Sequence, residues 1–249
     1  KIHCSVLAED AIKAAIATAE AKHGIARVLM NCAGIGGSQR VVGKEVLWDL
    51  PTMPEMHVLP RPIAWVCSRS PQGVLNVAPF SAFTFVSNKP PLLGINVGRK
   101  DGVRKDTANN ILASGEYVIH ISDQALLHAV HESAEEHPPE VSEVDLLGLQ
   151  TLPSSCIAVP RLAAAPVAME CRLHQVIPFG DTGAEFFVGE VLMFHVRDGL
   201  LRNGKVDSVE LDPLCRLGGP NYASLGPVQT LRALRQTPKS VVPRSADGG

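Results

Sequence analysis

Short segments rich in β-branched and aromatic residues, separated by turn residues, recur along this chain after Pro60. The segments 63–68 and 74–78 lie on either side of Ser70-Pro71-Gln72-Gly73, which is typical of a β-hairpin. Further segments of this kind predict strands at 81–87, 92–97, 117–121, 169–177 and 185–196. The last two flank Phe179-Gly180-Asp181-Thr182-Gly183, a turn that suits a long antiparallel hairpin.

Two helices are predicted between these strands, at 107–114 and 124–136. Asp106 stands at a favoured N-cap position, Gly115 follows the first helix, and a pair of prolines stops the second. Many strands joined by hairpins, with few helices, indicate a mainly β fold with appended helices, either a barrel or a sandwich.

The two ends of the chain have a different pattern. Residues 9–23 predict a helix, residues 25–30 a strand, and a glycine-rich loop follows. Periodicity is lost from 36 to 60, where three prolines indicate a linker. Residues 228–249 carry no apolar period, and we expect them to be disordered.

Composition excludes several classes of protein. Among 249 residues, 23 Lys and Arg face 25 Asp and Glu, so no net basic field favours nucleic acid. No apolar run approaches the roughly 18 residues of a membrane span, and charged residues interrupt the start of the chain where a signal peptide is apolar. Six scattered cysteines form no CxxC pair. We therefore expect a cytoplasmic protein with reduced thiols that binds neither nucleic acid nor membrane.

The segment 98–107 places four cations and two glycines directly before a predicted helix. A helix N-terminus offers unpaired N–H groups and a partial positive charge, so this loop suits a phosphate monoester. A solvated turn of mixed charge is the alternative, because Asp101 and Asp106 partly balance the cations.

The segment 76–84 combines a proline with small polar residues between phenylalanines. Backbone amides near Pro79, with the side chains of Asn76 and Ser81, suit the polar edge of a flat heterocycle beside Phe80 or Phe83. A bulged edge strand with phenylalanines in the core is the alternative interpretation.

Signatures of other chemistry are missing from the sequence. His128, His131 and His137 lie near three glutamates, but the HExxH order of zinc proteases is absent, and we expect a polar helix face and no metal. No GxSxG, Walker A or kinase-type glycine loop occurs. No catalytic nucleophile, acid or base is therefore assigned.

Several stretches together resemble the flavin reductase-like proteins in order and spacing, from about 60 to 226. They are Pro60-Arg-Pro-Ile-Ala-Trp-Val-Cys-Ser68, Asn76-Val-Ala-Pro-Phe-Ser81, Lys105-Asp-Thr-Ala-Asn-Asn-Ile111, Ala168-Met-Glu-Cys-Arg-Leu-His174, Gly189-Glu190 and Arg216-Leu-Gly-Gly219 with Tyr222. The resemblance implies an FMN-binding split β-barrel over 60–227, and a homodimer with flavin near the subunit interface.

The same resemblance implies the residues of the flavin site. It places the FMN phosphate near Lys105, Thr107 and Asn110. The ribityl chain and the ring would lie against Asn76, Ala78, Pro79, Phe80 and Ser81. Arg216, Gly219 and Tyr222 would close the site, either in the same subunit or from the neighbouring one.

The implied function is an FMN-dependent oxidoreductase in which NADH or NADPH reduces the flavin, which then passes electrons to a small molecule or a protein. The cofactor carries such chemistry and the protein supplies position and electrostatics. The alternative is an FMN-binding electron carrier with little turnover of its own.

The first 44 residues resemble a fragment of the short-chain dehydrogenases, through Arg27-Val-Leu-Met-Asn-Cys-Ala-Gly-Ile35 and the helix before it. The sequence contains no Tyr-x-x-x-Lys, and a glycine fingerprint for NAD would lie upstream of Lys1. A nicotinamide dehydrogenase is therefore the least favoured function. We expect 1–44 to be a small non-catalytic α/β fragment, joined by a linker at 45–59.

Overall fold

The structure, a computed structural model, describes residues 26–30, 38–42, 45–48, 58–235 and 237. The chain divides into two compact units, Lys1–His57 and Val58–Gly249. In the described part of the chain, no helix is long and apolar enough to cross a membrane.

The first unit contains an antiparallel sheet of three strands in the order β1-β2-β3. The strands are β1 (Ala26–Met30), β2 (Ser38–Val42) and β3 (Glu45–Trp48). The strand predicted at 25–30 is confirmed, whereas β2 and β3 lie where a linker was predicted. The linker prediction rested on the prolines of this segment, but all of them follow the strands. It gave too little weight to the β-branched Val41, Val42 and Val46, which favour strands. The helix predicted at 9–23 lies outside the described residues.

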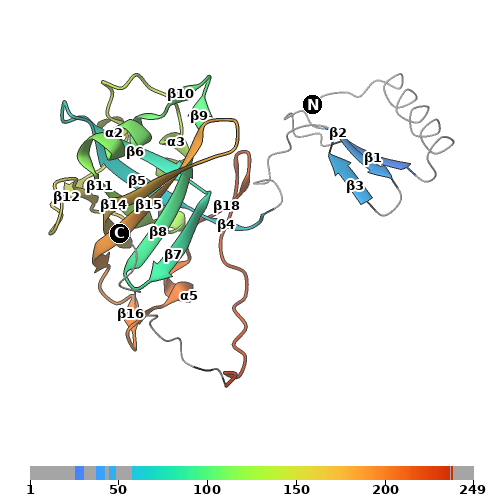
Figure 1. Cartoon of the computed structure of the whole chain (residues 1–249). Coiled ribbons are helices and arrows are strands. Elements are labelled where there is room, and N and C mark those ends of the chain that lie inside the picture. Colours follow the sequence, from blue (N-terminus) through green and yellow to red (C-terminus); the bar gives the residue numbers. More distant parts are fainter. Residues whose placement is uncertain (1–25, 31–37, 43–44, 49–57, 236, 238–249) are drawn as a thin grey trace, which may run out of the picture. The chain divides into compact units, whose positions relative to one another are not determined.

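The second unit is built around a seven-stranded antiparallel sheet in the order β6-β5-β11-β14-β15-β8-β7. All seven strands are labelled in Figure 1, and all were predicted from the sequence. They are β5 (Ala64–Arg69), β6 (Leu75–Phe80), β7 (Phe83–Asn88), β8 (Pro91–Val97), β11 (Glu116–Ile121), β14 (Val167–Phe179) and β15 (Ala184–Val196). The mainly β fold with appended helices, a split barrel, is thereby confirmed.

Short strands that the sequence did not predict complete the second unit. They are β4 (Arg61–Pro62), β9 (Arg99–Lys100), β10 (Val103–Arg104), β12 (Thr151–Leu152), β13 (Arg161–Leu162), β16 (Leu201–Arg202), β17 (Lys205–Val206), β18 (Cys215–Gly218) and β19 (Asn221–Ala223). Strands this short contain too few residues to show an alternating pattern.

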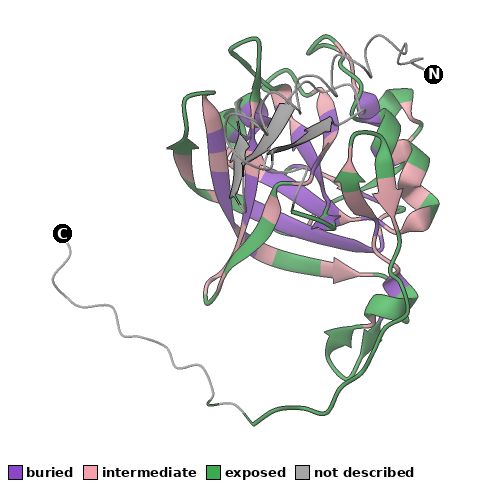
Figure 2. Cartoon of the chain, turned by 90° about the vertical axis from the view of Figure 1, so that its right-hand side faces the viewer, coloured by how far each residue is buried: buried purple, intermediate pink, exposed green. Residues whose placement is uncertain are grey.

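Both faces of the central strands are buried, as Figure 2 shows by the purple strands. One hydrophobic cluster holds Val66, Tyr117 and Phe187 and forms the barrel interior. The neighbouring residues on the same strands, such as Trp65 and Val118, belong to a second cluster, which includes helical and loop residues on the outside. Because successive side chains on a strand point to opposite faces, the same sheet packs against one hydrophobic cluster on each face.

The helices are α2 (Asp106–Ser114), the 3-10 turn η2 (Gln124–Leu126), α3 (Leu127–Glu132), α4 (Glu143–Leu146) and α5 (Ser208–Leu211). Two details of the predictions were wrong. The N-cap of α2 is Lys105, not Asp106, although Gly115 ends the helix in the left-handed conformation as predicted. The helix predicted at 124–136 begins with a 3-10 turn and ends at Glu132.

The early end of α3 has a tertiary cause. The Ser133 hydroxyl donates to the Val130 carbonyl and accepts a hydrogen bond from Trp65 Nε1 at 2.9 Å. Trp65 is fully buried on β5, so this contact fixes Ser133 and lets the chain turn away from the helix axis. The turn carries the next residues to the wall of a cavity.

Candidate cofactor site

A cavity of about 470 Å³ lies beside the start of α2, within the size range of small-molecule sites. Three parts of the chain form it: strand β6, the hairpin β9-β10 with the start of α2, and the stretch from the end of α3 to the start of α4. Its lining residues are Asn76, Ala78, Pro79, Phe80, Lys100, Asp101, Val103, Arg104, Lys105, Asp106, Thr107, Ser133, Ala134, Glu135, Glu136, His137, Pro139 and Glu143. The two loops that the sequence singled out separately thus meet at one cavity.

The start of α2 supplies the donors that an anion needs. The N–H groups of Asp106 and Thr107 have no carbonyl one turn back within the helix, and the helix dipole adds a partial positive charge. The Lys105 ammonium lies 5.8 Å from the centre of the Phe80 ring. Within the described residues, no carboxylate pairs with Lys105, so its charge is available to a ligand.

The other three cations of this loop are paired with carboxylates. Arg104 holds Glu185 through two hydrogen bonds of 2.8 Å, and these bonds are the main cause that lowers the pKa of Glu185. Arg99 lies 3.7 Å from Glu185 and donates to the Gly183 carbonyl at 2.9 Å, and Lys100 pairs with Glu136. These contacts tie the hairpin β9-β10 to the tip of the hairpin β14-β15 and to the opposite wall of the cavity.

Asn76 is the centre of a buried polar network on the inner wall. Its Oδ1 accepts hydrogen bonds from the hydroxyls of Thr107 at 2.8 Å and Ser68 at 3.3 Å. Its Nδ2 donates to Glu143 Oε2 at 3.1 Å, and the same oxygen accepts from the Val77 N–H at 3.3 Å. The carboxamide is therefore held in one orientation, and no described residue accepts its second amide hydrogen.

Six of the eleven predicted flavin-site residues line the cavity, namely Asn76, Ala78, Pro79, Phe80, Lys105 and Thr107. Ser81 and Asn110 do not line it, but Asn110 donates to Ser68 at 3.2 Å and so belongs to the network around Asn76. Arg216, Gly219 and Tyr222 also lie outside the lining. The Tyr222 hydroxyl contacts Arg216 and, at 3.1 Å, His131 of α3. Whether any of the eleven residues binds flavin stays a prediction.

The sequence did not predict the wall formed by 133–139, nor Glu143. Glu135, Glu136 and His137 were interpreted as part of a solvated helix face, but they follow the end of α3 and line the cavity. The pair Pro138-Pro139 was the available signal, because it marks a chain that turns after a helix. Glu143, buried on the short helix α4, carried no signal in the sequence.

Among the described residues, no cysteine lines this cavity. Burial raises the pKa of Cys67 to about 12 and that of Cys171 to about 12, which keeps both thiols protonated. Among the residues that the structure describes, no group of three or more His, Cys, Asp or Glu is placed to hold a metal ion. What the cavity offers is a cationic end, an amide network and an apolar wall of Phe80, Pro79 and Val103.

Comparisons with known proteins agree with this geometry. The flavin reductase like domain matches residues 56–214. An uncharacterised protein of Halalkalibacterium halodurans is 44% identical over 174 residues, which cover 68% of this chain and 83% of the relative.

Two solved structures are also similar at substantial identity. The nitrilotriacetate monooxygenase component B from Bacillus cereus is 40% identical with a TM-score of 0.66, over 70% of this chain and 89% of that chain. The 2-nitrobenzoate 2-nitroreductase of Pseudomonas fluorescens is 33% identical with a TM-score of 0.58, over 76% of this chain and 89% of that chain.

The split barrel, the cavity at the start of α2 and these similarities define the class as a flavin-related oxidoreductase. The chain belongs to the flavin reductase-like family, as its sequence motifs implied.

Proposed function

We propose that the chain binds FMN in the cavity beside α2 and uses it to pass electrons from NADH or NADPH to an acceptor. The observation that carries this proposal is the combination of an unpaired Lys105 and the free N–H groups of α2 at one end of a cavity with an apolar wall. A phosphate monoester needs such a cationic end, and a flat ring needs such a wall. The residues present therefore fit FMN.

The protein residues have distinct roles in this proposal. Lys105 and the first N–H groups of α2 hold the phosphate, while Asn76, fixed by Glu143 and Thr107, presents its remaining amide hydrogen toward the ligand. Phe80 and Pro79 cover apolar ligand surface and exclude water. Bound flavin supplies hydride and single-electron transfer, so no side chain has to act as an acid or base.

The test is a nicotinamide oxidation assay of the FMN-loaded chain. The proposal predicts that NADH or NADPH is oxidised faster than by the same concentration of free FMN. A chain that binds FMN but gives no such acceleration is the electron carrier that the sequence left as the alternative. The similarity of the chain to a monooxygenase component and to a nitroreductase supports an enzyme.

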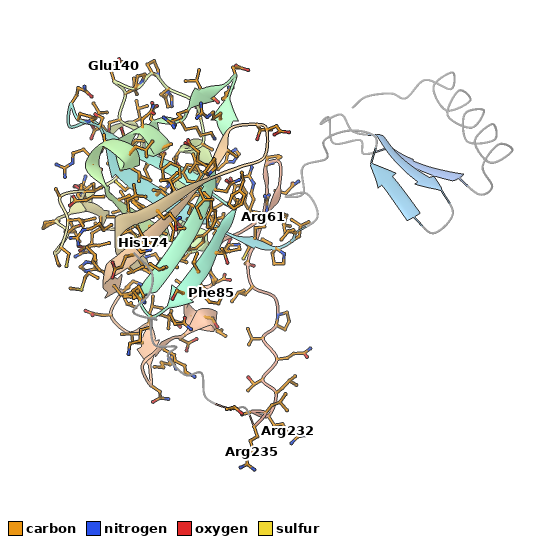
Figure 3. The ribbon with its side chains drawn as sticks, in the orientation of Figure 1. Arg61, Phe85, Glu140, His174, Arg232 and Arg235 are labelled. Atoms are coloured by element: carbon orange, nitrogen blue, oxygen red, sulfur yellow. The ribbon has the colours of Figure 1, made fainter. Side chains whose placement is uncertain are left out.

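The proposal includes a homodimer. Strand β7 is an edge of the sheet, and its Phe85 and Val86 are 64% and 44% exposed. Figure 3 shows Phe85 on the outer side of this strand. An exposed apolar edge strand needs a cover, and a second copy of the chain supplies one. Light scattering should show that the purified wild-type chain is a dimer. The Phe85→Asp variant should shift toward the monomer. A wild-type chain that is monomeric would contradict the proposed dimer.

A further inference from the structure

A second cavity lies far along β15 from the first. The two cavities lie near opposite ends of the hairpin β14-β15. Glu185, which holds Arg104 near the first cavity, pairs with Pro178 near the turn of the hairpin. His195, in the second cavity, pairs with Ala168 at the open end. The second cavity, of about 390 Å³, is lined by Arg161, Ala163, Ala165, Pro166, Phe194, His195, Val196 and Arg197. It shares no lining residue with the first cavity.

The charged groups of this second cavity are cationic. Two arginines line it, from β13 and from the residue after β15, and none of its lining residues is acidic. The second cavity therefore favours a negatively charged ligand.

Arg161 differs from an exposed surface arginine in the burial of part of its guanidinium. Its Nε is buried, and in the described part of the chain it has no hydrogen-bond partner. A buried donor without an acceptor costs free energy, so the protein itself does not satisfy this guanidinium fully. A guanidinium also binds a carboxylate through two parallel hydrogen bonds.

The neighbouring Arg197 and His195 side chains are already held in place by the protein's own carboxylates. Arg197 Nη1 donates to Asp123 Oδ2 at 2.9 Å, which leaves its other guanidinium hydrogens available. His195 Nε2 lies 2.6 Å from Oε1 of the fully buried Glu170, whose two oxygens also accept from the N–H groups of Ser155 and Cys156 at 2.6 Å. Glu170 is thus fully engaged and fixes the ring of His195 at the cavity wall.

The rest of the lining is apolar. Phe194 is 55% exposed, and it is joined by Val196, Pro166 and two alanines. Covering an exposed phenylalanine with an apolar group is favourable by the area removed from water. A ligand that matches both parts has an anionic head and a small hydrocarbon body.

From these contacts we infer that the second cavity binds a small organic carboxylate, with its carboxylate on Arg161 and Arg197 and its hydrocarbon body on Phe194. This site is separate from the proposed flavin site and does not depend on it. It provides a place for an acidic substrate or effector on a face of the barrel to which no role has been assigned.

Calorimetric titration of the full chain with phenylacetate tests the inference, with the neutral phenylacetamide as the matched ligand. We expect saturable binding of phenylacetate and at least about tenfold weaker binding of the amide, because the amide lacks the charge that the arginines attract. Equal binding of the two ligands, or no saturable binding of phenylacetate, would overturn the inference.

Variants locate the site. Arg161→Gln should weaken phenylacetate at least about tenfold, whereas Arg172→Gln, the same charge change at an exposed position of β14 outside the cavity, should leave it unchanged. Phe194→Ala should weaken phenylacetate but not acetate. If Arg161→Gln does not fold, Arg197→Gln replaces it, because that side chain is 46% exposed. Unchanged affinity in the folded arginine variant, or displacement of phenylacetate by FMN in a one-to-one ratio, would contradict a separate carboxylate site.

Discussion

Lys105 differs from the other cations of its loop in one respect: it has no carboxylate partner among the described residues. Arg99 and Arg104 both pair with Glu185, and Lys100 pairs with Glu136. Of the four cations in this loop, Lys105 is therefore the one whose charge is available to hold a phosphate. The contribution of this single side chain can be measured.

Lys105→Ala should weaken FMN binding by about 10- to 150-fold. This range corresponds to the loss of one charge-assisted hydrogen bond, which contributes roughly 1.5 to 3 kcal/mol. Riboflavin has the same ring without the phosphate, so its affinity should hardly change. Thr107→Ala should weaken FMN binding less, because the Thr107 hydroxyl is neutral and already donates a hydrogen bond to Asn76. Fluorescence titration of both ligands gives these values.

Lys89→Ala is the matched control, since Lys89 lies in the turn between β7 and β8, away from the cavity. It should bind both ligands as the wild type does. Equal weakening of FMN and riboflavin by Lys105→Ala would mean that Lys105 supports the ring or the fold and does not hold the phosphate.

His120 is a residue whose protonation should affect stability. It is fully buried, its Nδ1 bonds to the Trp65 carbonyl at 2.9 Å, and its Nε2 accepts from the Leu162 N–H at 2.9 Å. Burial lowers the pKa of His120 from 6.5 to about 4, assisted by Arg161 and His195 and opposed by the Trp65 carbonyl. Because Nε2 accepts, the ring is neutral and a second proton would break the Leu162 bond.

The unfolded chain therefore binds a proton at higher pH than the folded chain does. The stabilisation is complete above pH 6.5 and is lost as the pH falls toward 4, by up to about 3 kcal/mol. Urea unfolding across this range should show the loss, and it should be smaller in His120→Gln, which cannot be protonated. The same pH dependence in both proteins would assign the effect to other groups.

At the scale of elements, close packing between β11 and β15 limits what the strands tolerate. A Cβ at Gly189 would lie 2.0 Å from the Tyr117 hydroxyl, and Tyr117 is fully buried and cannot move aside. The hydroxyl has no hydrogen-bond partner in the described residues, and burial raises the pKa of Tyr117 well above its ordinary value. Glycine at this position is thus required by packing.

Gly189→Ala should destabilise the fold by about 1 to 3 kcal/mol, the usual range for overpacking a core. Gly98→Ala, where nothing lies within 4 Å of the added carbon, is the control and should cost much less. Tyr117→Phe removes the closest atom and should recover part of the loss in the double variant. Chemical denaturation of the four variants measures this, and equal stability of the two alanine variants would contradict the packing.

The sequence predicted the seven long strands and α2 because each contains enough residues to show propensity, alternation or an end signal. The two-residue strands and the end of α3 could not be predicted, because they depend on contacts between distant residues, such as Trp65 with Ser133. The site follows the same division. The local motifs at Asn76 and Lys105 were visible in the sequence, but the wall at 133–139 and the buried Glu143 come to the cavity only through the fold.

At the scale of the whole molecule, the chain consists of two units, and every described residue of the proposed flavin site belongs to the second, Val58–Gly249. A protein without residues 1–44 should therefore bind FMN with unchanged affinity. Titration of the full and shortened chains with FMN makes the comparison. A shortened chain that stays folded but no longer binds FMN would show that the first unit contributes to the site.

The central claim, that this flavin reductase-like chain holds FMN at the start of α2, is tested most directly by the chromophore of the purified protein. After incubation with FMN and removal of the free ligand, the absorbance spectrum and the mass of the compound released by denaturation give its identity and amount. One FMN per subunit is the predicted result. Release of FAD or haem, or failure to retain any FMN, would contradict the claim.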